Sequence, residues 1–418
     1  DELAHRLTMA GFEVEGREAV AGEFTQVVVG EVLETAKHPD ADKLTVCRVS
    51  AGEGTAPLHI VCGAKNVRAG LKAPLALVGA QLPGGLAIKR AKLRGVESQG
   101  MLCSSRELGL GEGIDGLLEL PSTLRSGEDL CTALGLDDVV LETNFTPNRG
   151  AALSVLAERP LTWPALAPVP ATATDTFPVQ LSAPAACAKF AGRVLRGVDP
   201  QAPTPLWMQE RLRRAGLRSL GPMIDVTNYV MIELGQPMHA YDLRRLQGGI
   251  DVRFARTGEK LTLLEGSDIA LATDELVIAD ATGPVALAGI MGGEKSGIAP
   301  DTTDVFLEVA WFAPEAIQGR GRRHGIVTDA SQRFERGVDA TAQERAIERA
   351  TQLLLEIAGG RAGPTVVEVA AEHLPQRAPI PLTAAYLKRL IGVVVPPERV
   401  RAILERLGMH VSGGPDTW

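Results

Sequence analysis

This chain is organised around the stretch Asp225-Val-Thr-Asn-Tyr-Val-Met-Ile-Glu-Leu-Gly-Gln-Pro-Met-His-Ala-Tyr-Asp242. Its first half is mostly apolar, which favours a buried strand or the start of a helix, and its second half breaks at Gly235 and Pro237. The break predicts a loop that carries three polar side chains, Gln236, His239 and Asp242. Thr227 and Asn228 cannot both face an apolar core without hydrogen-bond partners. Polar groups this dense beside an apolar scaffold indicate a functional site.

The composition is that of an ordinary soluble globular protein. The 418 residues are 45% hydrophobic, 22% charged and only 4% aromatic, and this length predicts two to four domains. No apolar run reaches the ~20 residues of a membrane-spanning helix, and the first residues, Asp1-Glu-Leu-Ala-His5, lack the basic region of a signal peptide. We therefore expect a cytoplasmic chain that begins inside its first helix.

The cysteines and the net charge restrict the kinds of site to expect. The five cysteines are widely spaced and form no Cys-x-x-Cys pair, so we expect reduced thiols and no structural zinc. A formal net charge of -8 argues against a protein that coats nucleic acid indiscriminately. A local basic face remains compatible with nucleic-acid binding.

Two patterns divide the first 140 or so residues. Residues 1–16 have the spacing of a short amphipathic helix, with Gly11 near its end. From Phe24 to about Leu136, short β-like runs separated by Gly, Pro and Asp predict a small barrel of five or so strands. The five runs are 27–33, 43–49, 59–62, 73–78 and 85–90.

Four cations lie close together near the last of these runs: Lys89, Arg90, Lys92 and Arg94. Strand alternation would direct two or more of them to one face, where they would attract phosphates. The alternative is a solvated edge strand that charge protects from pairing. Because few aromatic residues are available for stacking on bases, any RNA contact here should be mostly with the backbone.

The remainder predicts a linker, a large unit and a short C-terminal segment. Residues 160–178 are rich in Pro, Ala and Thr, which is typical of a linker. From Val179 to about Val369, strands and helices are interleaved, which predicts an α+β domain. Its expected helices are 205–216 and 340–358, and its expected strands are 250–255, 260–264, 275–279, 285–288 and 304–309. Two helices, from Thr383 and from Pro396, and a strand at 409–411 should follow.

Three motifs of the predicted barrel occur in a specific order: His38-Pro-Asp-Ala-Asp-Lys-Leu44, Ile60-Val-Cys-Gly-Ala-Lys-Asn-Val67 and Leu93-Arg-Gly-Val-Glu-Ser-Gln-Gly-Met-Leu-Cys-Ser-Ser105. They resemble the tRNA-binding OB-fold domain that is attached to several aminoacyl-tRNA synthetases. The match in order over about 110 residues makes this resemblance specific.

The α+β unit carries further motifs: Asp225-Val-Thr-Asn-Tyr229, Gly235-Gln-Pro-Met-His-Ala240, Gly289-Ile-Met-Gly-Gly-Glu294, Leu307-Glu308 and Gly319-Arg-Gly-Arg-Arg-His-Gly-Ile-Val-Thr-Asp-Ala-Ser-Gln-Arg-Phe-Glu-Arg-Gly337. Together with the barrel motifs, they resemble the β subunit of bacterial phenylalanyl-tRNA synthetase over nearly the whole chain. Leu141-Glu-Thr-Asn-Phe-Thr-Pro-Asn-Arg-Gly150 resembles the segment in which that family returns to its N-terminal domain. Ala151 departs from the family's usual aspartate, and the helix expected after Leu156 is cut short.

The resemblance implies a multidomain α+β architecture. An OB-fold β-barrel at 24–137 would be inserted in a small N-terminal α/β domain formed by 1–23 and 138–160. A linker at 161–178 would lead to an editing domain at 179–370. Residues 380–418 would be the start of a winged-helix-like domain, which we expect to be truncated.

In that family the editing domain hydrolyses tyrosine that has been wrongly esterified to phenylalanine tRNA. The implied partners are the α subunit, in an α2β2 assembly, and phenylalanine tRNA, with no membrane and no DNA. ATP and magnesium are implied for the full enzyme, and no cofactor is implied for this part of it. Editing has a physical reason, because a hydrophobic pocket rejects an added hydroxyl only roughly a hundredfold.

The resemblance also implies roles for particular residues. Glu308 would accept a hydrogen bond from the phenol of tyrosine, although a capping or salt-bridged glutamate is the alternative. The other implied substrate contacts are Asn228, Thr227, Arg218, Gly292, Gly293 and Ala330. His239 and Thr328 would orient the ester or the attacking water as the catalytic pair, with a structural histidine as the alternative. Gly292 and Gly293 equally suit a tight turn.

Arg322 and Arg323 would join the four barrel cations in binding tRNA, unless they belong to a solvated surface loop. No nucleophile-base-orienter triad and no zinc-ligand spacing is evident, so we expect metal-free hydrolysis with water as the nucleophile. Two other functions stay open at this stage: an RNA-binding and assembly module without hydrolysis, and a sugar- or nucleotide-binding protein. The second would need a phosphate loop, which the sequence lacks.

Overall fold

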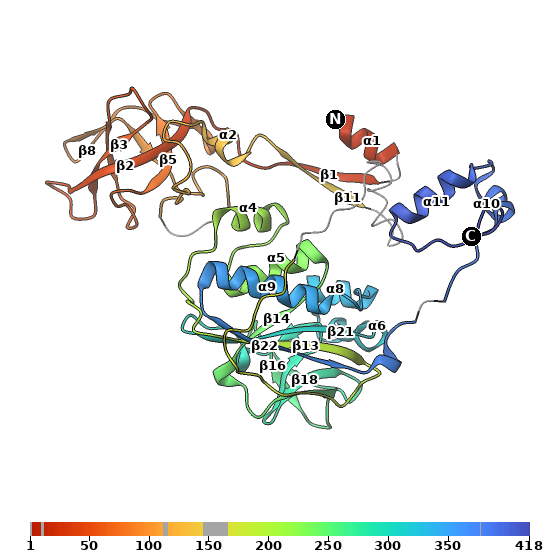
Figure 1. Ribbon diagram of the computed structural model, residues 1–418. Helices are drawn as coiled ribbons and strands as arrows, with labels where there is room; N and C mark the ends of the chain where they lie inside the picture. Colours follow the sequence, from red (N-terminus) through yellow and green to blue (C-terminus); the bar gives the residue numbers. More distant parts are fainter. Residues whose placement is uncertain (1, 10–11, 112–115, 145–165, 377) are drawn as a thin grey trace. The chain divides into compact units, whose positions relative to one another are not determined.

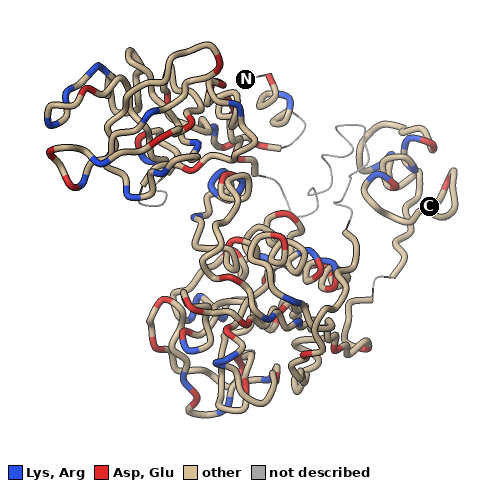
Figure 2. The backbone as a smooth tube through the Cα atoms, turned by 60° about the vertical axis from the view of Figure 1, so that its left-hand side comes forward, with Lys and Arg blue, Asp and Glu red and all other residues tan. Residues whose placement is uncertain are grey.

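A computed structural model describes residues 2–9, 12–111, 116–144, 166–376 and 378–418 of the chain (Figure 1). These residues fall into two compact units, 1–161 with 396–412 and 162–395 with 413–418. The expected multidomain, mixed α/β chain is confirmed at this level. The features expected at Ala151 and after Leu156 lie outside the described residues. Figure 2 shows basic and acidic residues interspersed along both units.

The first unit contains a nearly closed, barrel-like antiparallel sheet in the strand order β10-β5-β2-β3-β4. Its strands are β2 (Val27–Lys37), β3 (Thr45–Ser50), β4 (Leu58–Cys62), β5 (Lys72–Leu77) and β10 (Gly100–Leu102). Alternate residues such as Val32, Val49 and Leu75 fill the interior of this sheet. This alternation explains why the short apolar runs in the sequence predicted the strands.

One predicted barrel strand is wrong. Residues 85–90 contribute only β7 (Leu86–Ala87), which pairs with β6 (Gln81–Leu82) across η1 (Pro83–Gly85), and the fifth barrel strand is β10 instead. Gly84 and Gly85 have φ values of 77° and 80°, so the chain turns there instead of continuing in the sheet. The basic cluster therefore lies beside a separate hairpin of β8 (Ala91–Leu93) and β9 (Val96–Ser98).

The predicted N-terminal helix is also too long. Helix α1 (Glu2–Met9) is followed by β1 (Glu13–Ala19), which pairs antiparallel with β11 (Val139–Asn144). A partner strand that is remote in sequence thus overrides the local helical spacing. Helix α2 (Leu130–Leu134) precedes β11, and α11 (Pro397–Arg406) also belongs to this unit. The strand predicted at 409–411 is wrong, because these residues form no strand.

The second unit contains two sheets that face each other. The first has the order β14-β21-β13-β22 and consists of β14 (His239–Asp242), β21 (Asp304–Phe312), β13 (Cys187–Arg196) and β22 (Arg361–Val369). The second has the order β12-β15-β18-β19-β20 and consists of β12 (Val179–Leu181), β15 (Ile250–Phe254), β18 (Leu276–Asp280), β19 (Gly283–Leu287) and β20 (Met291–Gly292). Helices α5 (Pro222–Leu234) and α9 (Gln343–Ala358) cover the outer face of the first sheet (Figure 1).

Strand β21 is buried on both faces, and its alternation decides which residues meet the second sheet. Val305, Leu307 and Val309 pack in the cluster shared with the helices. Phe306, Ala310 and Phe312 pack in the cluster between the two sheets. Glu308 has the same parity as the latter set, so its carboxylate lies between the sheets.

The stretch 225–242 is a helix followed by an edge strand. Helix α5 runs to Leu234, and Gly235 ends it with a φ of 71° while its N–H donates to the carbonyl of Met231. The predicted loop is wrong for His239 and Asp242, which begin and end β14. The reason is that β14 pairs with β21, a partner that local sequence cannot reveal.

The remaining elements of the second unit are short. They are α4 (Leu206–Arg214), η3 (Leu243–Arg245), β16 (Lys260–Thr262), β17 (Asp268–Ala270), η4 (Glu294–Ser296), α6 (Pro314–Ile317), α7 (Arg320–Arg323), α8 (Asp329–Arg336), η5 (Ala371–His373) and α10 (Ala384–Ile391). In the described part of the chain, no helix has both the length and the apolar character needed to cross a membrane.

Candidate functional site

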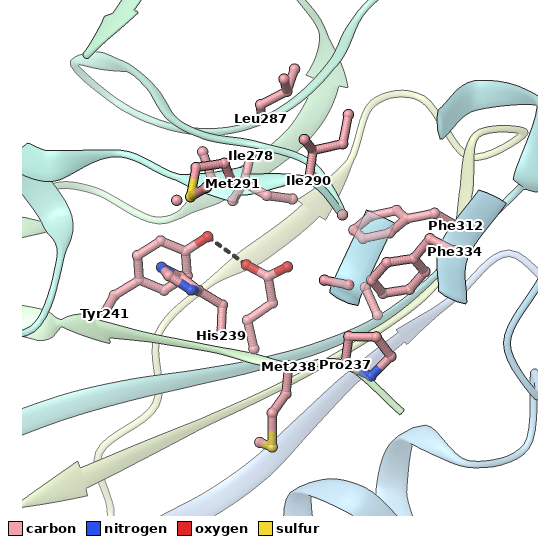
Figure 3. Close-up of a pocket in the computed structure, with 16 residues that line it drawn as sticks. Pro237, Met238, His239, Tyr241, Ile278, Leu287, Ile290, Met291, Phe312 and Phe334 are labelled. Atoms are coloured by element: carbon pink, nitrogen blue, oxygen red, sulfur yellow. Dashed lines mark hydrogen bonds between the residues drawn. The ribbon is translucent and has the colours of Figure 1, made fainter. Parts of the chain in front are cut away.

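A pocket opens between the two sheets of the second unit (Figure 3). Its walls come from β14, β21, β18, β19, β20 and α8, and its empty volume, mouth included, is about 430 Å³. Most of the lining side chains are apolar: Ile278, Leu287, Ile290, Met291, Ala310, Phe312, Ala330 and Phe334 among them. Only a few polar side chains enter it, an arrangement typical of small-molecule sites.

Among the described residues that line this pocket, Glu308 alone carries a carboxylate. It is 6% exposed, and its Oε2 accepts a hydrogen bond of 2.5 Å from the phenol of Tyr241. In Figure 3, Tyr241 and His239 lie on one side of the pocket, and the rings of Phe312 and Phe334 lie on the other. The described residues that surround Glu308 in the pocket include no Lys or Arg, so it is not the salt-bridged glutamate of the alternative interpretation.

Burial controls the ionisation of this group. It raises the pKa of Glu308 to about 7, although the hydrogen bond from Tyr241 acts in the opposite direction. Burial, together with the adjacent charge of Glu308, also raises the pKa of Tyr241 well above its ordinary value. Tyr241 is therefore the donor, and Glu308 is a carboxylate held near its midpoint at neutral pH.

His239 stands directly opposite Glu308 in the ladder between β14 and β21. Its Nε2 is buried and has no hydrogen-bond partner among the described residues, which is uncommon for a buried polar atom. Burial lowers the pKa of His239 to about 4, so the ring is neutral at pH 7. A neutral imidazole with an unused ring nitrogen can donate to or accept from a ligand or a water, depending on its tautomer.

Gly292 makes room for this imidazole. A Cβ at position 292 would lie 2.5 Å from Cε1 and 2.6 Å from Nε2 of His239. A Cβ at Gly293 would instead lie 2.6 Å from the carbonyl oxygen of Val285. Gly292 lines the pocket and Gly293 follows it, so the first glycine shapes the site and the second permits a close approach of backbone.

Thr328 and Ala330 lie at the start of α8. The Thr328 hydroxyl accepts from the N–H of Ser331 and donates to the carbonyl of Ile290, both at 3.0 Å, which makes it the helix N-cap. Its one proton is thus already used within the fold. Ala330 lines the pocket, where its small side chain leaves space.

Four predicted substrate contacts, Thr227, Asn228, Arg218 and Gly293, do not line this pocket, and neither does Thr328. Thr227 and Asn228 lie on α5, on the other side of the sheet from Glu308, and the Thr227 hydroxyl donates to the carbonyl of Ile224 at 2.8 Å. Arg218 is exposed in the connection between α4 and α5. The structure therefore brings together His239, Glu308, Gly292 and Ala330. It leaves Asn228, Thr227 and Arg218 away from the pocket, and Gly293 and Thr328 adjoin its lining residues without being part of it.

The four barrel cations are all exposed on or beside the β8–β9 hairpin. Arg90 forms an ion pair with Glu97 at 3.5 Å. Lys92 stands opposite Glu97 in the β-ladder, and Arg94 occupies the turn with a φ of 48°. We call residues 89–98 the basic hairpin.

The two arginines predicted to bind tRNA in the second unit lie on α7. Each of them pairs with a carboxylate. Arg323 donates to both oxygens of Asp274 at 2.7 and 2.8 Å, and the Arg322 guanidinium lies 3.4 Å from the carboxylate of Glu335. These pairs reduce the local positive charge. Among the residues described, no group of three or more His, Cys, Asp or Glu side chains is arranged to hold a metal ion.

The sequence did not single out Tyr241, although it belongs to the opening stretch. Its signal is the two-residue spacing from His239, which puts both side chains on one face of a strand. Phe312 and Phe334 were missed too, and their rings contact each other with centroids 4.9 Å apart. Only their positions in the fold show that they form one wall.

Two family models match the chain. One, described as a putative tRNA binding domain, matches residues 27–129, and the other, described as a B3/4 domain, matches residues 186–359. The phenylalanine–tRNA ligase beta subunits of Methylococcus capsulatus, Dickeya dadantii and Pseudomonas putida are 54%, 53% and 51% identical to it. Each alignment covers 100% of this chain and 54% of the relative, so the chain spans about half the length of these curated relatives.

Proposed function

The chain belongs to the family of phenylalanine–tRNA ligase β subunits, and on this basis we propose that its second unit is an editing hydrolase that releases tyrosine from phenylalanine tRNA. The observation that carries the proposal is the buried carboxylate of Glu308 in an otherwise apolar pocket. The B3/4 family match includes this whole pocket.

Glu308 supplies the selectivity in this proposal. A tyrosine side chain fills the apolar walls with its ring and donates its phenol to the carboxylate. A phenylalanine side chain fills the same walls but leaves the carboxylate oxygen that Tyr241 does not use without a donor. Because an unpaired buried polar group costs about 1–3 kcal/mol, and more when it is charged, the correctly charged tRNA is spared.

Hydrolysis needs an oriented ester and a water. The unused Nε2 of neutral His239 supports a role in binding the ester carbonyl or the attacking water. Thr328 keeps only acceptor capacity, because its proton goes to Ile290, so its proposed role is to position α8 and accept from the water. An aminoacyl ester is already activated, and positioning with polarisation suffices to accelerate its hydrolysis.

Asn228, Thr227 and Arg218 fit this proposal less well than the pocket residues do. They lie away from the pocket, so a direct contact with the tyrosyl group is not supported. Arg218 is exposed and cationic, which suits contact with a phosphate of the tRNA. Gly292 and Ala330 keep their proposed role of leaving space for the substrate, whereas Gly293 supports the site through its close approach to the carbonyl of Val285.

The proposed architecture follows the family. An OB-fold at 24–137 binds tRNA through the basic hairpin and interrupts a small domain of 1–23 and 138–160, which the pairing of β1 with β11 supports. A linker at 161–178, the editing domain at 179–370 and the start of a winged-helix-like domain at 380–418 complete it. Attachment of phenylalanine, with ATP and magnesium, belongs to the assembly with the α subunit, which we propose as α2β2.

The test is hydrolysis of tyrosine from Tyr-tRNA(Phe) by the assembled α/β enzyme. Glu308→Ala removes the phenol acceptor and His239→Ala removes the unpaired imidazole, so each should reduce hydrolysis roughly ten- to a hundredfold. Glu372→Ala, an exposed carboxylate away from the pocket, is the control. No hydrolysis by the intact assembly, or wild-type rates in both pocket variants, would overturn the proposal. A binding and assembly module without hydrolysis is not favoured, since it leaves the pocket unexplained.

A further inference from the structure

Tyr241 is the least expected member of the pocket, because it already occupies the acceptor proposed for the substrate. Its side chain is fully buried, and its phenol donates to Oε2 of Glu308 at 2.5 Å. The His239 ring meets it edge-on, with centroids 4.4 Å apart and an interplanar angle of 78°. Phe306 stacks near it, with centroids 6.4 Å apart. These contacts hold the phenol in one orientation.

The hydrogen bond from Tyr241 leaves further acceptor positions on the Glu308 carboxylate. An ionised carboxylate has two oxygens and about four lone-pair positions, of which Tyr241 uses one. The pocket is lined by Glu308 and Tyr241 and also by Phe312 and Phe334, whose rings lie away from Tyr241 (Figure 3). A second phenol that enters beside Phe312 and Phe334 can therefore meet the carboxylate without displacing Tyr241.

We propose that Tyr241 is a positioning residue for specificity, which fixes one oxygen of Glu308 so that the other receives the phenol of the substrate's tyrosine. The inference rests on the proposed editing function. Tyr241 and the substrate's phenol would then each donate a hydrogen bond to the same Glu308 carboxylate, one to each oxygen.

The ionisation of Glu308 gives this role a distinctive readout. The polar or titratable groups near its carboxylate are Tyr241 and His239 from β14 and the fully buried thiol of Cys187 from β13. The second sheet and α8 present apolar side chains, including Ile278, Leu287 and Phe334. Tyr241 therefore supplies the hydrogen bond that offsets part of the burial effect on the pKa of Glu308.

Tyr241→Phe removes only the donor oxygen. Without that hydrogen bond, the pKa of Glu308 should rise. The kcat/KM for Tyr-tRNA(Phe) should increase with pH as Glu308 ionises, and this increase should occur about one pH unit higher in the variant than in the wild type. At pH 7 hydrolysis should fall about tenfold and recover at higher pH. Hydrolysis of Phe-tRNA(Phe) should change less, so the ratio between the two esters should fall.

The control is Tyr229→Phe in the assembled enzyme. The Tyr229 phenol also donates to a carboxylate, Glu233 at 2.9 Å, but it lies on α5 outside the pocket. This variant should keep the wild-type pH profile and ester ratio. Difluorotyrosine at position 241 keeps the shape of the side chain with a stronger donor, and it should move the increase in kcat/KM to lower pH.

The outcomes separate the inference from the proposed function. A wild-type profile and ester ratio in both position-241 variants, with hydrolysis still lost in Glu308→Ala, would overturn the inference and leave the editing function standing. If the wild-type assembly does not hydrolyse Tyr-tRNA(Phe), the proposed function itself fails. Opposite shifts of the increase in kcat/KM along the pH scale in the two variants would support the inference.

Discussion

The basic hairpin of the first unit and the pocket of the second unit both depend on ionisable side chains, but in opposite surroundings. Lys89, Lys92 and Arg94 are exposed, and water and salt screen exposed charges within about 10 Å at 0.1 M ionic strength. Glu308 has apolar neighbours and one phenol donor. An exposed cation attracts any phosphate, whereas a buried carboxylate favours only a ligand that brings a matching donor. The hairpin thus suits contact with any RNA backbone, and the pocket suits discrimination between two side chains.

The largest expected effect tests whether the pocket carboxylate is as costly to ionise as this contrast requires. The pKa of Glu308 rises from an ordinary 4.5 to about 7, so between these pH values the folded state keeps a proton that the unfolded state has released. Folding stability contributed by this group is therefore complete below pH 4.5 and is lost as the pH rises through 7. Glu308→Gln should gain about 3 kcal/mol relative to wild type across this range, measured by denaturant unfolding.

His239 acts in the other direction, because its pKa is lowered to about 4 and its contribution is lost as the pH falls through that value. It is present in both proteins, so the difference between them isolates Glu308. For Glu372→Gln, at an exposed position, the difference in the free energy of unfolding between variant and wild type should not change with pH. If the difference in the free energy of unfolding for Glu308→Gln were also constant with pH, burial would not disfavour the charge of Glu308, and the pocket would not differ in this respect from the exposed basic hairpin.

A smaller effect tests the close packing around His239 in the pocket. Gly292→Ala puts a Cβ 2.5 Å from the His239 ring, which must shift, at a cost of about 1–3 kcal/mol. Thermal unfolding should occur at a lower temperature, and hydrolysis of Tyr-tRNA(Phe) should fall.

Gly63→Ala in the barrel is the matched change, because its added Cβ meets nothing closer than Cδ2 of Leu44 at 3.6 Å. It should leave stability and hydrolysis close to wild type. If Gly63→Ala lowered stability and hydrolysis as much as Gly292→Ala, the close packing around His239 would not be important for the site.

The smallest effect belongs to the basic hairpin. Lys92→Ala should weaken binding of phenylalanine tRNA several-fold at low salt and lower the slope of log affinity against log salt by about one. Arg90→Ala should do less, because Arg90 already pairs with Glu97 at 3.5 Å. Fluorescence anisotropy at several salt concentrations measures both. A loss that persists at high salt would show that the hairpin reads the RNA by specific contacts.

Much of the barrel was predictable because its strands alternate and its turns contain glycine and proline. The run at 85–90 failed as the fifth strand because Gly84 and Gly85 turn the chain, so β10 fills that place. The helix predicted over 1–16 failed beyond Met9 for a related reason. β1 pairs with β11, more than a hundred residues further along, and such pairing overrides local periodicity.

For the site, the sequence by itself determined which residue types are available, and strand alternation puts Glu308 on the same face as Phe306 and Ala310. Only the tertiary structure showed that this face meets the second sheet and not the helices. The motifs of the sequence also determined the family. Only the tertiary structure decided that Tyr241 donates to Glu308, that Gly292 admits His239, and that Thr328 donates to the carbonyl of Ile290. The register between β14 and β21 decides the first, and packing across the two sheets decides the others. Contacts of this kind join segments far apart in the chain, and no local pattern specifies them.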